Sequence, residues 1–219
     1  MIVPAMSETE IQNELSKDYK SCIARIQKDM NKYRRGIIKA SKFPFYFKPI
    51  EHTSPSKNNF IIYVDAKSKK DALMPFITIV AYYNRPEGIY AAMIFPVFGG
   101  KFKVLIYPPH FFKRYKERYI KEDLSNIMVI KAFFRNNPTY MLQVVEDENF
   151  SGSCNQGFVF GKILNPSISI IKTFISTDML KGDQTSLNEI LLNELNDYYE
   201  STKKPNISFK SFNNRLLRA

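Results

Sequence analysis

A histidine and two arginines recur at intervals of four residues in the segment Pro108–Tyr119, which reads PPHFFKRYKERY. If Pro109 stands in the first turn of a helix, His110, Arg114 and Arg118 lie on one helical face. A neutral imidazole can accept a proton from a ribose 2′-hydroxyl, and guanidinium groups can hold a phosphate and stabilise the charge that develops on it. The pattern therefore suits RNA cleavage that needs no metal ion.

The expected position of His110 favours its neutral form. A residue in the first helical turn lies at the positive end of the helix dipole, and two nearby arginines act in the same direction. Neutral imidazole is the form that a general base needs. The alternative is a structural role, in which His110 caps or packs the end of the helix and the arginines pair with acidic residues.

Positive charge is concentrated around this motif. The 219 residues include 32 Lys and Arg against 21 Asp and Glu, a formal net charge of +11. Between Lys101 and Lys121, seven basic residues accompany one acidic residue, Glu117. Such a surface attracts phosphates, so RNA or another polyanion is the expected partner. The candidate nucleic-acid contacts are Lys101, Lys103, Lys113, Lys116, Lys121 and, further along the chain, Lys172.

The elements that must position the motif are predicted from hydrophobic patterning. Ser7 and Glu10 have capping-box spacing before apolar residues that recur every three or four positions, so a helix is expected from Ser7 to a stop at Gly36. A Pro- and Lys-rich connection is expected at 39–57. Strands are then expected at 60–64, 76–83, 89–95, 102–107, 140–145, 157–163 and 167–175, and further helices at 109–119, 122–135 and about 187–199.

These elements predict an α+β fold: an antiparallel sheet with an N-terminal helix, a central helical pair and a C-terminal helix. Three segments are expected, namely the N-terminal helix and connection at 1–57, a core at 58–182 with the basic motif at 105–121, and the C-terminal helix and tail at 183–219. The aromatic residues of the motif should seat its helix on the sheet; they are Phe111, Phe112, Tyr115 and Tyr119.

Composition argues against several other classes of protein. No apolar run approaches the ~20 residues that span a bilayer, and the first residues lack the order of a signal peptide, so a cytoplasmic protein without a membrane partner is expected. Two cysteines, Cys22 and Cys154, and two histidines do not make a four-ligand zinc site unless they meet by chance. His52 is expected at the surface. The small number of Cys and His ligands therefore argues against a metal site. No Gly-rich phosphate loop is present, so no cofactor is expected either.

The segment 105–134 resembles a stretch of small bacterial proteins of unknown function, in which a His-x3-Arg-x3-Arg helix follows a strand and precedes an isoleucine, an acidic residue and a second helix. These proteins look like relatives of the toxin ribonucleases of the barnase, EndoU, colicin and RelE superfamily. The resemblance implies His110 as the acid or base and Arg114 and Arg118 as phosphate-holding residues. It further implies an auxiliary hydroxyl from a late strand, either Thr173 or Ser176.

Hypotheses from different classes follow. The first is a metal-independent endoribonuclease, or a toxin-like relative of one, that acts on RNA. The second is a non-catalytic nucleic-acid-binding protein that uses the same basic surface. The third is an uncharacterised bacterial interaction protein that binds no nucleic acid. An acidic protein is a further expected partner of a chain with this excess of positive charge.

Overall fold

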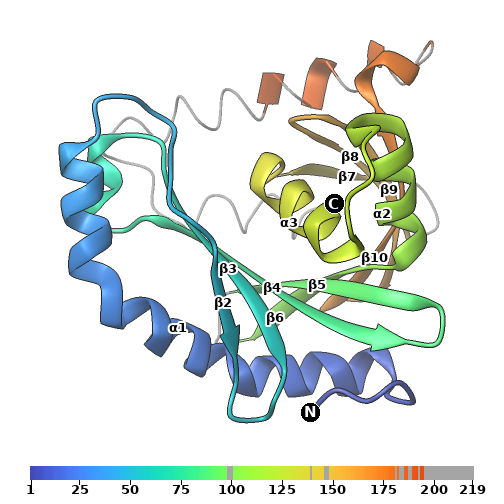
Figure 1. Ribbon diagram of the computed structural model, residues 1–219. Helices are drawn as coiled ribbons and strands as arrows, with labels where there is room; N and C mark the ends of the chain where they lie inside the picture. The colour runs from blue at the N-terminus through green and yellow to red at the C-terminus, as the bar shows by residue number, and fades with distance from the viewer. Residues whose placement is uncertain are drawn as a thin grey trace. The chain divides into compact units, whose positions relative to one another are not determined.

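The chain forms two compact units of helices and strands, which confirms the α+β class (Figure 1). The computed structural model describes residues 1–97, 101–138, 140–145, 148–180, 182, 185–186, 189–191 and 193–194. The first unit comprises Met1–Phe95 and Phe102–Ile106, and the second comprises Pro96–Lys101 and Tyr107–Ala219. The units follow spatial contacts, whereas the three segments predicted from the sequence follow composition along the chain.

The first unit is built on a long helix, α1, Glu8–Lys39. Its start is the predicted capping box: the Ser7 amide donates to Glu10 Oε2 over 2.8 Å, and the Glu10 amide donates to Ser7 Oγ over 3.4 Å. Of the apolar positions spaced by three and four, Tyr19 and Met30 are half-buried and the others are buried, namely Ile11, Leu15, Cys22, Ile26 and Tyr33.

The helix continues past Gly36, where the sequence predicted its end. A Cβ atom at Gly36 would lie 2.8 Å from Cε1 of Phe47, which is closer than carbon atoms approach in folded proteins. The ring of Phe47 also meets Tyr33 at a centroid distance of 4.8 Å. Glycine therefore stands here because an aromatic ring packs against the helix backbone, and not because the helix stops.

The strands of the first unit are β1 (Phe45–Tyr46), β2 (Ile50–Thr53), β3 (Asn59–Ala66), β4 (Phe76–Arg85), β5 (Gly88–Pro96) and the part of β6 (Phe102–Tyr107) as far as Ile106. β3 pairs antiparallel with β1, β2 and β4, and β4 pairs antiparallel with β5. A short 3-10 helix, η1, Lys69–Ala72, precedes β4. The segment predicted as a connection at 39–57 thus contributes two short strands.

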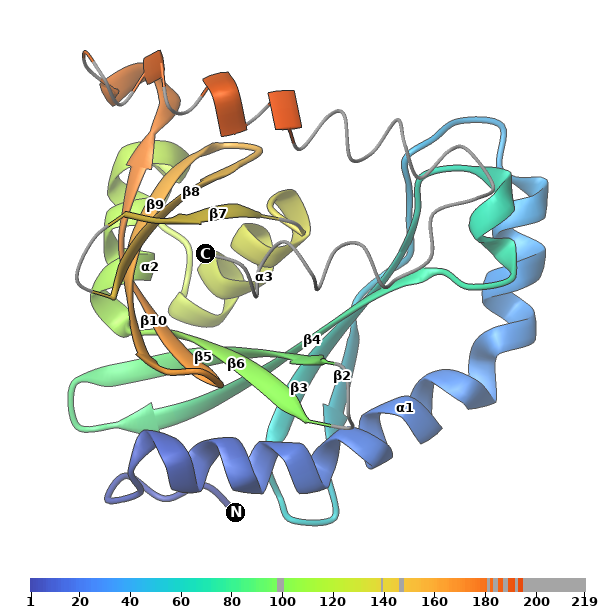
Figure 2. The ribbon, with the colours of Figure 1, turned by 180° about the vertical axis from the view of Figure 1, so that it is seen from behind.

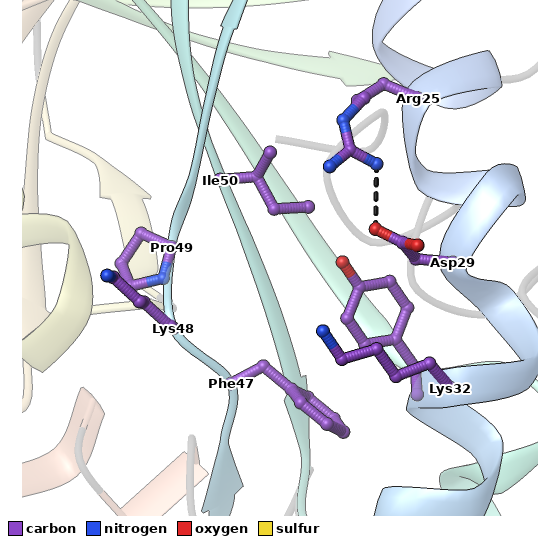
Figure 3. A pocket seen from close by; sticks show the side chains of 8 residues that line it. Arg25, Asp29, Lys32, Phe47, Lys48, Pro49 and Ile50 are labelled. Atoms are coloured by element: carbon purple, nitrogen blue, oxygen red, sulfur yellow. Dashed lines mark hydrogen bonds and ion pairs between the residues drawn. The ribbon is translucent and has the colours of Figure 1, made fainter.

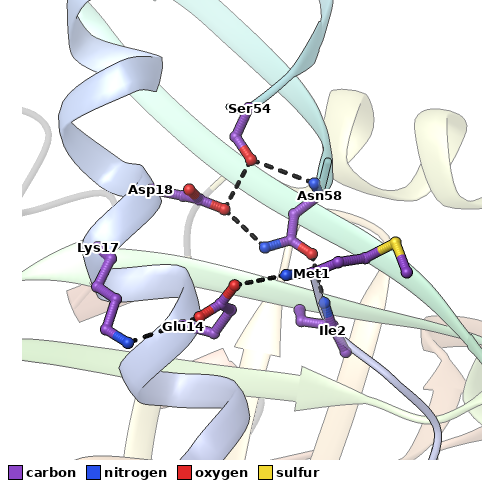
Figure 4. Close-up of polar contacts among 7 residues, drawn as sticks. All are labelled: Met1, Ile2, Glu14, Lys17, Asp18, Ser54 and Asn58. Carbon is purple, nitrogen blue, oxygen red and sulfur yellow. Dashed lines mark hydrogen bonds and ion pairs between the residues drawn. The ribbon is translucent and has the colours of Figure 1, made fainter. Parts of the chain in front are cut away.

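A buried polar network joins α1 to the turn after β2 (Figure 4). Oδ2 of Asp18 accepts hydrogen bonds from Ser54 Oγ and Asn58 Nδ2, both over 2.7 Å. Asp18, Ser54 and Asn58 are all about 5 % exposed or less. Burying a carboxylate is costly unless its oxygens are hydrogen-bonded, so these two donors explain why an acidic residue occupies the inner face of α1.

The second unit contains α2 (Pro109–Tyr115), a single π-helical turn η3 (Lys116–Ile120), α3 (Asn126–Asn136) and the 3-10 helix η4 (Thr177–Met179). Its strands are β7 (Met141–Val144), β8 (Asn149–Cys154), β9 (Gly157–Asn165) and β10 (Ile168–Ser176), in the spatial order β10-β9-β8-β7. Neighbouring strands in this order pair antiparallel, and α2 packs against β10 and α3 (Figure 2).

Several elements depart from the sequence-based arrangement. The predicted sheet with an N-terminal helix, a central helical pair and a C-terminal helix is matched only in part, because the strands divide between two compact units. β8 was not among the predicted strands, and the helix predicted at 122–135 begins at Asn126. The C-terminal helix predicted at 187–199 falls largely outside the described residues. Across the described part of the chain, no helix is long and apolar enough to cross a membrane.

Candidate functional site

The side of α2 and η3 that carries His110, Arg114 and Arg118 lies along a β-bulge in β10. In the pairing of β10 with β9, Ile171 faces Gly161 and Thr173 faces Phe160, so Lys172 is an extra residue without a partner in the ladder. The backbone groups of an extra residue are available for other bonds. The carbonyl oxygen of Lys172 accepts a hydrogen bond of 2.7 Å from Nε2 of His110.

Three hydrogen bonds join the motif to three successive residues of β10: His110 Nε2 to the Lys172 carbonyl, Arg114 Nη1 to Thr173 Oγ1, and Arg118 Nη1 to the Phe174 carbonyl. The prediction that the histidine and both arginines share one face is therefore confirmed. The structure also brings Thr173 to this face, as an acceptor for Arg114. Ser176 is only 2 % exposed, so its hydroxyl is not presented with the others.

The contact with Lys172 fixes the tautomer of His110. A carbonyl oxygen can only accept a hydrogen bond, so Nε2 carries the proton. In neutral imidazole the other nitrogen, Nδ1, then holds the lone pair. The side chain of His110 is exposed. A backbone carbonyl thus orients the ring and leaves Nδ1 as the atom that could accept a proton from a ligand.

Both arginines keep donors for an anion. A guanidinium has five N–H donors, and β10 uses one from each arginine. Arg114 is exposed and Arg118 is partly buried. Among the described residues, neither forms an ion pair with a carboxylate. The bonds to β10 therefore set the direction of the two guanidinium groups without neutralising their charge.

The candidate lysines differ in their availability. Four are exposed and belong to the second unit: Lys101, Lys113, Lys121 and Lys172. Lys116 also belongs to it, but its ammonium donates to Asp123 Oδ1 over 2.6 Å and to the Leu124 carbonyl over 2.8 Å. Lys103 belongs to the first unit and is partly buried. Lys113 also forms an exposed ion pair with Glu117, at 4.0 Å, so Lys121 and Lys172 are the exposed lysines of the motif and β10 that have no ion pair among the described residues.

Tyr119 is a site residue that sequence reasoning placed wrongly. It was expected to seat the helix on the sheet, but it is 42 % exposed and its ring stacks on Tyr115, at a centroid distance of 5.6 Å and an interplanar angle of 5°. Tyr119 lies in the π-helical turn η3, a local widening of the helix that occurs often at functional sites. An exposed aromatic ring next to Arg118 can stack on a planar ligand group.

The other motif aromatics hold the face rigidly. Phe111 and Tyr115 are fully buried and Phe112 nearly so, as predicted. At their centre is Phe133 of α3, whose ring meets those of Tyr107, Phe111, Phe112, Tyr115, Phe134, Tyr140 and Phe174. Tyr115 also donates to Gln156 Oε1 over 2.5 Å. The cationic side chains therefore stand on a packed support, as a binding site requires.

The other histidine and the two cysteines are poorer candidates for catalysis. His52, predicted at the surface, is partly buried in β2, with Nε2 3.2 Å from Ser21 Oγ; burial and the nearby Arg25 lower its pKa. Burial raises the pKa of both thiols, Cys22 and Cys154, to about 12, so neither is a nucleophile near neutral pH. Within the described residues, no group of three or more His, Cys, Asp or Glu side chains could hold a metal ion.

The first unit carries an open hollow of about 260 Å³ between α1 and the chain segment 47–50 (Figure 3). Its lining includes three cationic side chains, Arg25, Lys32 and Lys48. Arg25 is already paired with Asp29, which lies 2.8 Å away in the same hollow.

Comparison of the chain with models of protein families, with curated proteins and with solved structures yields no match.

Proposed function

We propose that the protein binds RNA through the face formed by α2, η3 and β10, and we call this the α2–β10 face. The observation that carries the proposal is the anchoring of the motif on β10, which aims two guanidinium groups and leaves most of their donors unused. Charge-assisted bonds from guanidinium to phosphate are among the strongest hydrogen bonds in proteins. The exposed lysines Lys121 and Lys172 and a net charge of +11 favour a polyanion.

The exposed ring of Tyr119 favours single-stranded RNA over a duplex. In a duplex the bases are stacked on one another, whereas an unpaired base can stack on an aromatic side chain. Tyr119 is backed by the parallel ring of Tyr115 and follows Arg118 directly, so a base and its phosphate could be held together. The expected ligand is therefore an unpaired stretch of RNA.

The arginines provide the test of phosphate binding. Arg114→Ala should weaken binding of a single-stranded RNA oligonucleotide by about 1–3 kcal/mol, because a charge-assisted contact is lost. It should also reduce the slope of log affinity against log salt by about one. Fluorescence anisotropy over a salt series measures both quantities. Arg34→Ala, at an exposed position of α1 in the first unit, is the matched control and should change neither.

Two outcomes would contradict the proposal. One is the absence of measurable RNA binding at low ionic strength, and the other is binding that does not depend on salt. A loss of affinity in Arg34→Ala equal to that in Arg114→Ala would show that RNA is attracted by overall charge and not by the α2–β10 face.

Tyr119 gives a separate prediction about the kind of RNA. Tyr119→Ala should reduce affinity for single-stranded RNA by about 1–3 kcal/mol, the usual contribution of a stacked base, and should leave affinity for a duplex nearly unchanged. Tyr119→Phe keeps the ring and should retain single-strand affinity. Competition experiments with strands of equal length measure the difference. Equal losses for both kinds of RNA would remove the stacking role.

A metal-independent endoribonuclease is the second candidate function, and the tautomer of His110 favours it. Nδ1 of His110 would take the proton of a 2′-hydroxyl as the 2′-oxygen bonds to the adjacent phosphorus. The bond from phosphorus to the 5′-oxygen breaks, which leaves a 2′,3′-cyclic phosphate, and the leaving 5′-oxygen takes a proton from water to become a 5′-hydroxyl. Arg114 and Arg118 would stabilise the negative charge on the phosphoryl oxygens.

A further inference from the structure

The turn between η1 and β4 in the first unit exposes a run of apolar side chains. Leu73 is 77 % exposed and Met74 is 72 % exposed, the two highest values among large apolar side chains of the described residues. Phe76 and Ile77, at the start of β4, are 38 % and 37 % exposed. Strongly exposed large apolar side chains that lie next to one another in the chain, as Leu73 and Met74 do, mark an interaction site in a folded protein. We call residues 73–77 the apolar tip.

The apolar tip is held in place by packed structure. Ala72 and Pro75, which flank its two most exposed residues, are buried. Ala72 belongs to a small core with Ile37 and Ala66, on which Phe43 and Phe47 also pack, and η1 contacts α1. The carboxylate of Asp71 accepts hydrogen bonds from the amides of residues 67 and 68, over 2.7 and 2.8 Å. The fold therefore presents Leu73 and Met74 outward.

Lysines surround the apolar tip. Lys69 and Lys70 of η1 are exposed. Lys39, the last residue of α1, and Lys42, just beyond that helix, are exposed as well, and η1 contacts α1. The ammonium of Lys67 lies over the ring of Phe76, 4.7 Å from its centroid. Two acidic groups lie nearby: the carboxylate of Asp71 faces backbone amides, and Asp65 is buried opposite Phe76 in the pairing of β3 with β4. This end of the first unit is thus both apolar and positively charged.

We infer that the apolar tip inserts into the headgroup region of an anionic lipid surface. A protein partner would have to offer a pocket shaped for each protruding side chain, whereas the interface of a bilayer conforms to a convex apolar surface. Leucine, methionine and phenylalanine enter that interface readily, and lysines beside them are attracted to anionic headgroups. The contact is peripheral, it needs no membrane-spanning helix, and it does not depend on RNA binding by the second unit.

The chain contains no tryptophan, which allows a clean test. In the Leu73→Trp variant of the 219-residue chain, the only tryptophan reports on the apolar tip. Its fluorescence should shift to shorter wavelength when vesicles of phosphatidylcholine with phosphatidylserine are added, because the indole leaves water. Vesicles of phosphatidylcholine alone should give a much smaller shift. Met128→Trp is the matched control, since Met128 is 49 % exposed on α3 of the second unit, and it should show no shift.

Vesicle flotation tests the same inference without a probe. The double variant Leu73→Ser with Met74→Ser should lose roughly tenfold or more in affinity for phosphatidylserine vesicles, because the apolar surface that would be buried is removed. Lys69→Glu with Lys70→Glu should lose a comparable amount, and higher salt should weaken binding by the original chain. Lys20→Glu with Lys28→Glu, exposed on α1, makes the same change of charge elsewhere in the first unit and should retain vesicle binding.

Three results would overturn the inference. The first is an absence of vesicle binding by the original chain, and the second is unchanged binding by the double serine variant. The third is a fluorescence shift in the Leu73→Trp variant that depends on protein concentration when no vesicles are present, because it would show that the apolar tip docks onto another protein molecule. Circular dichroism of each variant checks that these surface substitutions leave the fold intact.

Discussion

Replacing His110 by alanine should slow RNA cleavage by roughly 10²–10⁴-fold in the presence of a chelator, with RNA affinity nearly unchanged. The rate falls because the mechanism assigns the 2′-hydroxyl proton to Nδ1 of His110, whereas a neutral imidazole adds little to phosphate attraction. Single-turnover cleavage and anisotropy measure the two quantities on the same oligonucleotide. His52→Ala, which removes the other histidine in the other unit, is the control and should cleave at the original rate.

The outcomes of this experiment separate the candidate functions. Cleavage at the original rate by His110→Ala would place the base elsewhere or reveal a contaminating nuclease. Binding that depends on Arg114, without any cleavage by the original chain, would leave the α2–β10 face as an RNA-binding surface only. Strict dependence on a divalent ion would defeat the mechanism even if RNA were cut, because the mechanism assigns the phosphate charge to the two arginines.

Phe133→Ala should lower the free energy of unfolding of the second unit by about 3–5 kcal/mol. Phe133 is fully buried, and its ring is the common neighbour of the aromatic residues that support α2. Removing it leaves a cavity that the surrounding rings cannot fill without moving. Urea unfolding followed by circular dichroism measures the change. Met128→Ala, on the exposed side of the same helix, should change stability by less than about 0.5 kcal/mol.

A small effect of Phe133→Ala would show that the aromatic cluster can collapse around the missing ring. The support of the α2–β10 face would then be less rigid than its packing indicates, and the argument for a preorganised site would weaken.

The parts of the fold that local chemistry decides were predictable from the sequence. The capping box at Ser7 and the apolar spacing of α1 are properties of neighbouring residues, so the start and the buried face of the helix follow from them. Gly36 was wrongly predicted to end the helix, because its role depends on a residue that is distant in the sequence. Its lack of a side chain accommodates Phe47, which is distant in the sequence and whose approach no local pattern reveals.

The missed strands depend on pairing between distant segments. β8, Asn149–Cys154, contains Ser151, Gly152 and Ser153, which read as a loop, yet all three are buried between β7 and β9. A Cβ atom at Gly152 would collide with Leu142 of β7, so glycine is required by the neighbouring strand. β-Propensity describes a residue's fit to its neighbours more than a preference of its own.

The candidate site likewise has one part that neighbouring residues determine and one part that depends on the pairing of distant strands. The shared face of His110, Arg114 and Arg118 follows from helical spacing and was predicted. Their acceptors on β10 could not be predicted, because the bulge at Lys172 arises from the register between β10 and β9. Tyr119 was misplaced because a regular helix would have turned it inward, and the π-helical turn η3 did not show in the spacing of apolar residues.

The two buried cysteines allow local opening of each unit to be measured by thiol modification. Cys22 lies in α1 of the first unit and Cys154 lies in β8 of the second, and both thiols are free and buried. A reagent that modifies thiols can reach either sulfur only while the surrounding structure is transiently open, so the modification rate reports the free energy of that local opening. Serine at one cysteine leaves a single reporter. Each unit thus carries a natural label for native-state thiol exchange, and the cooperativity of the two units can be read from whether both labels respond equally to denaturant.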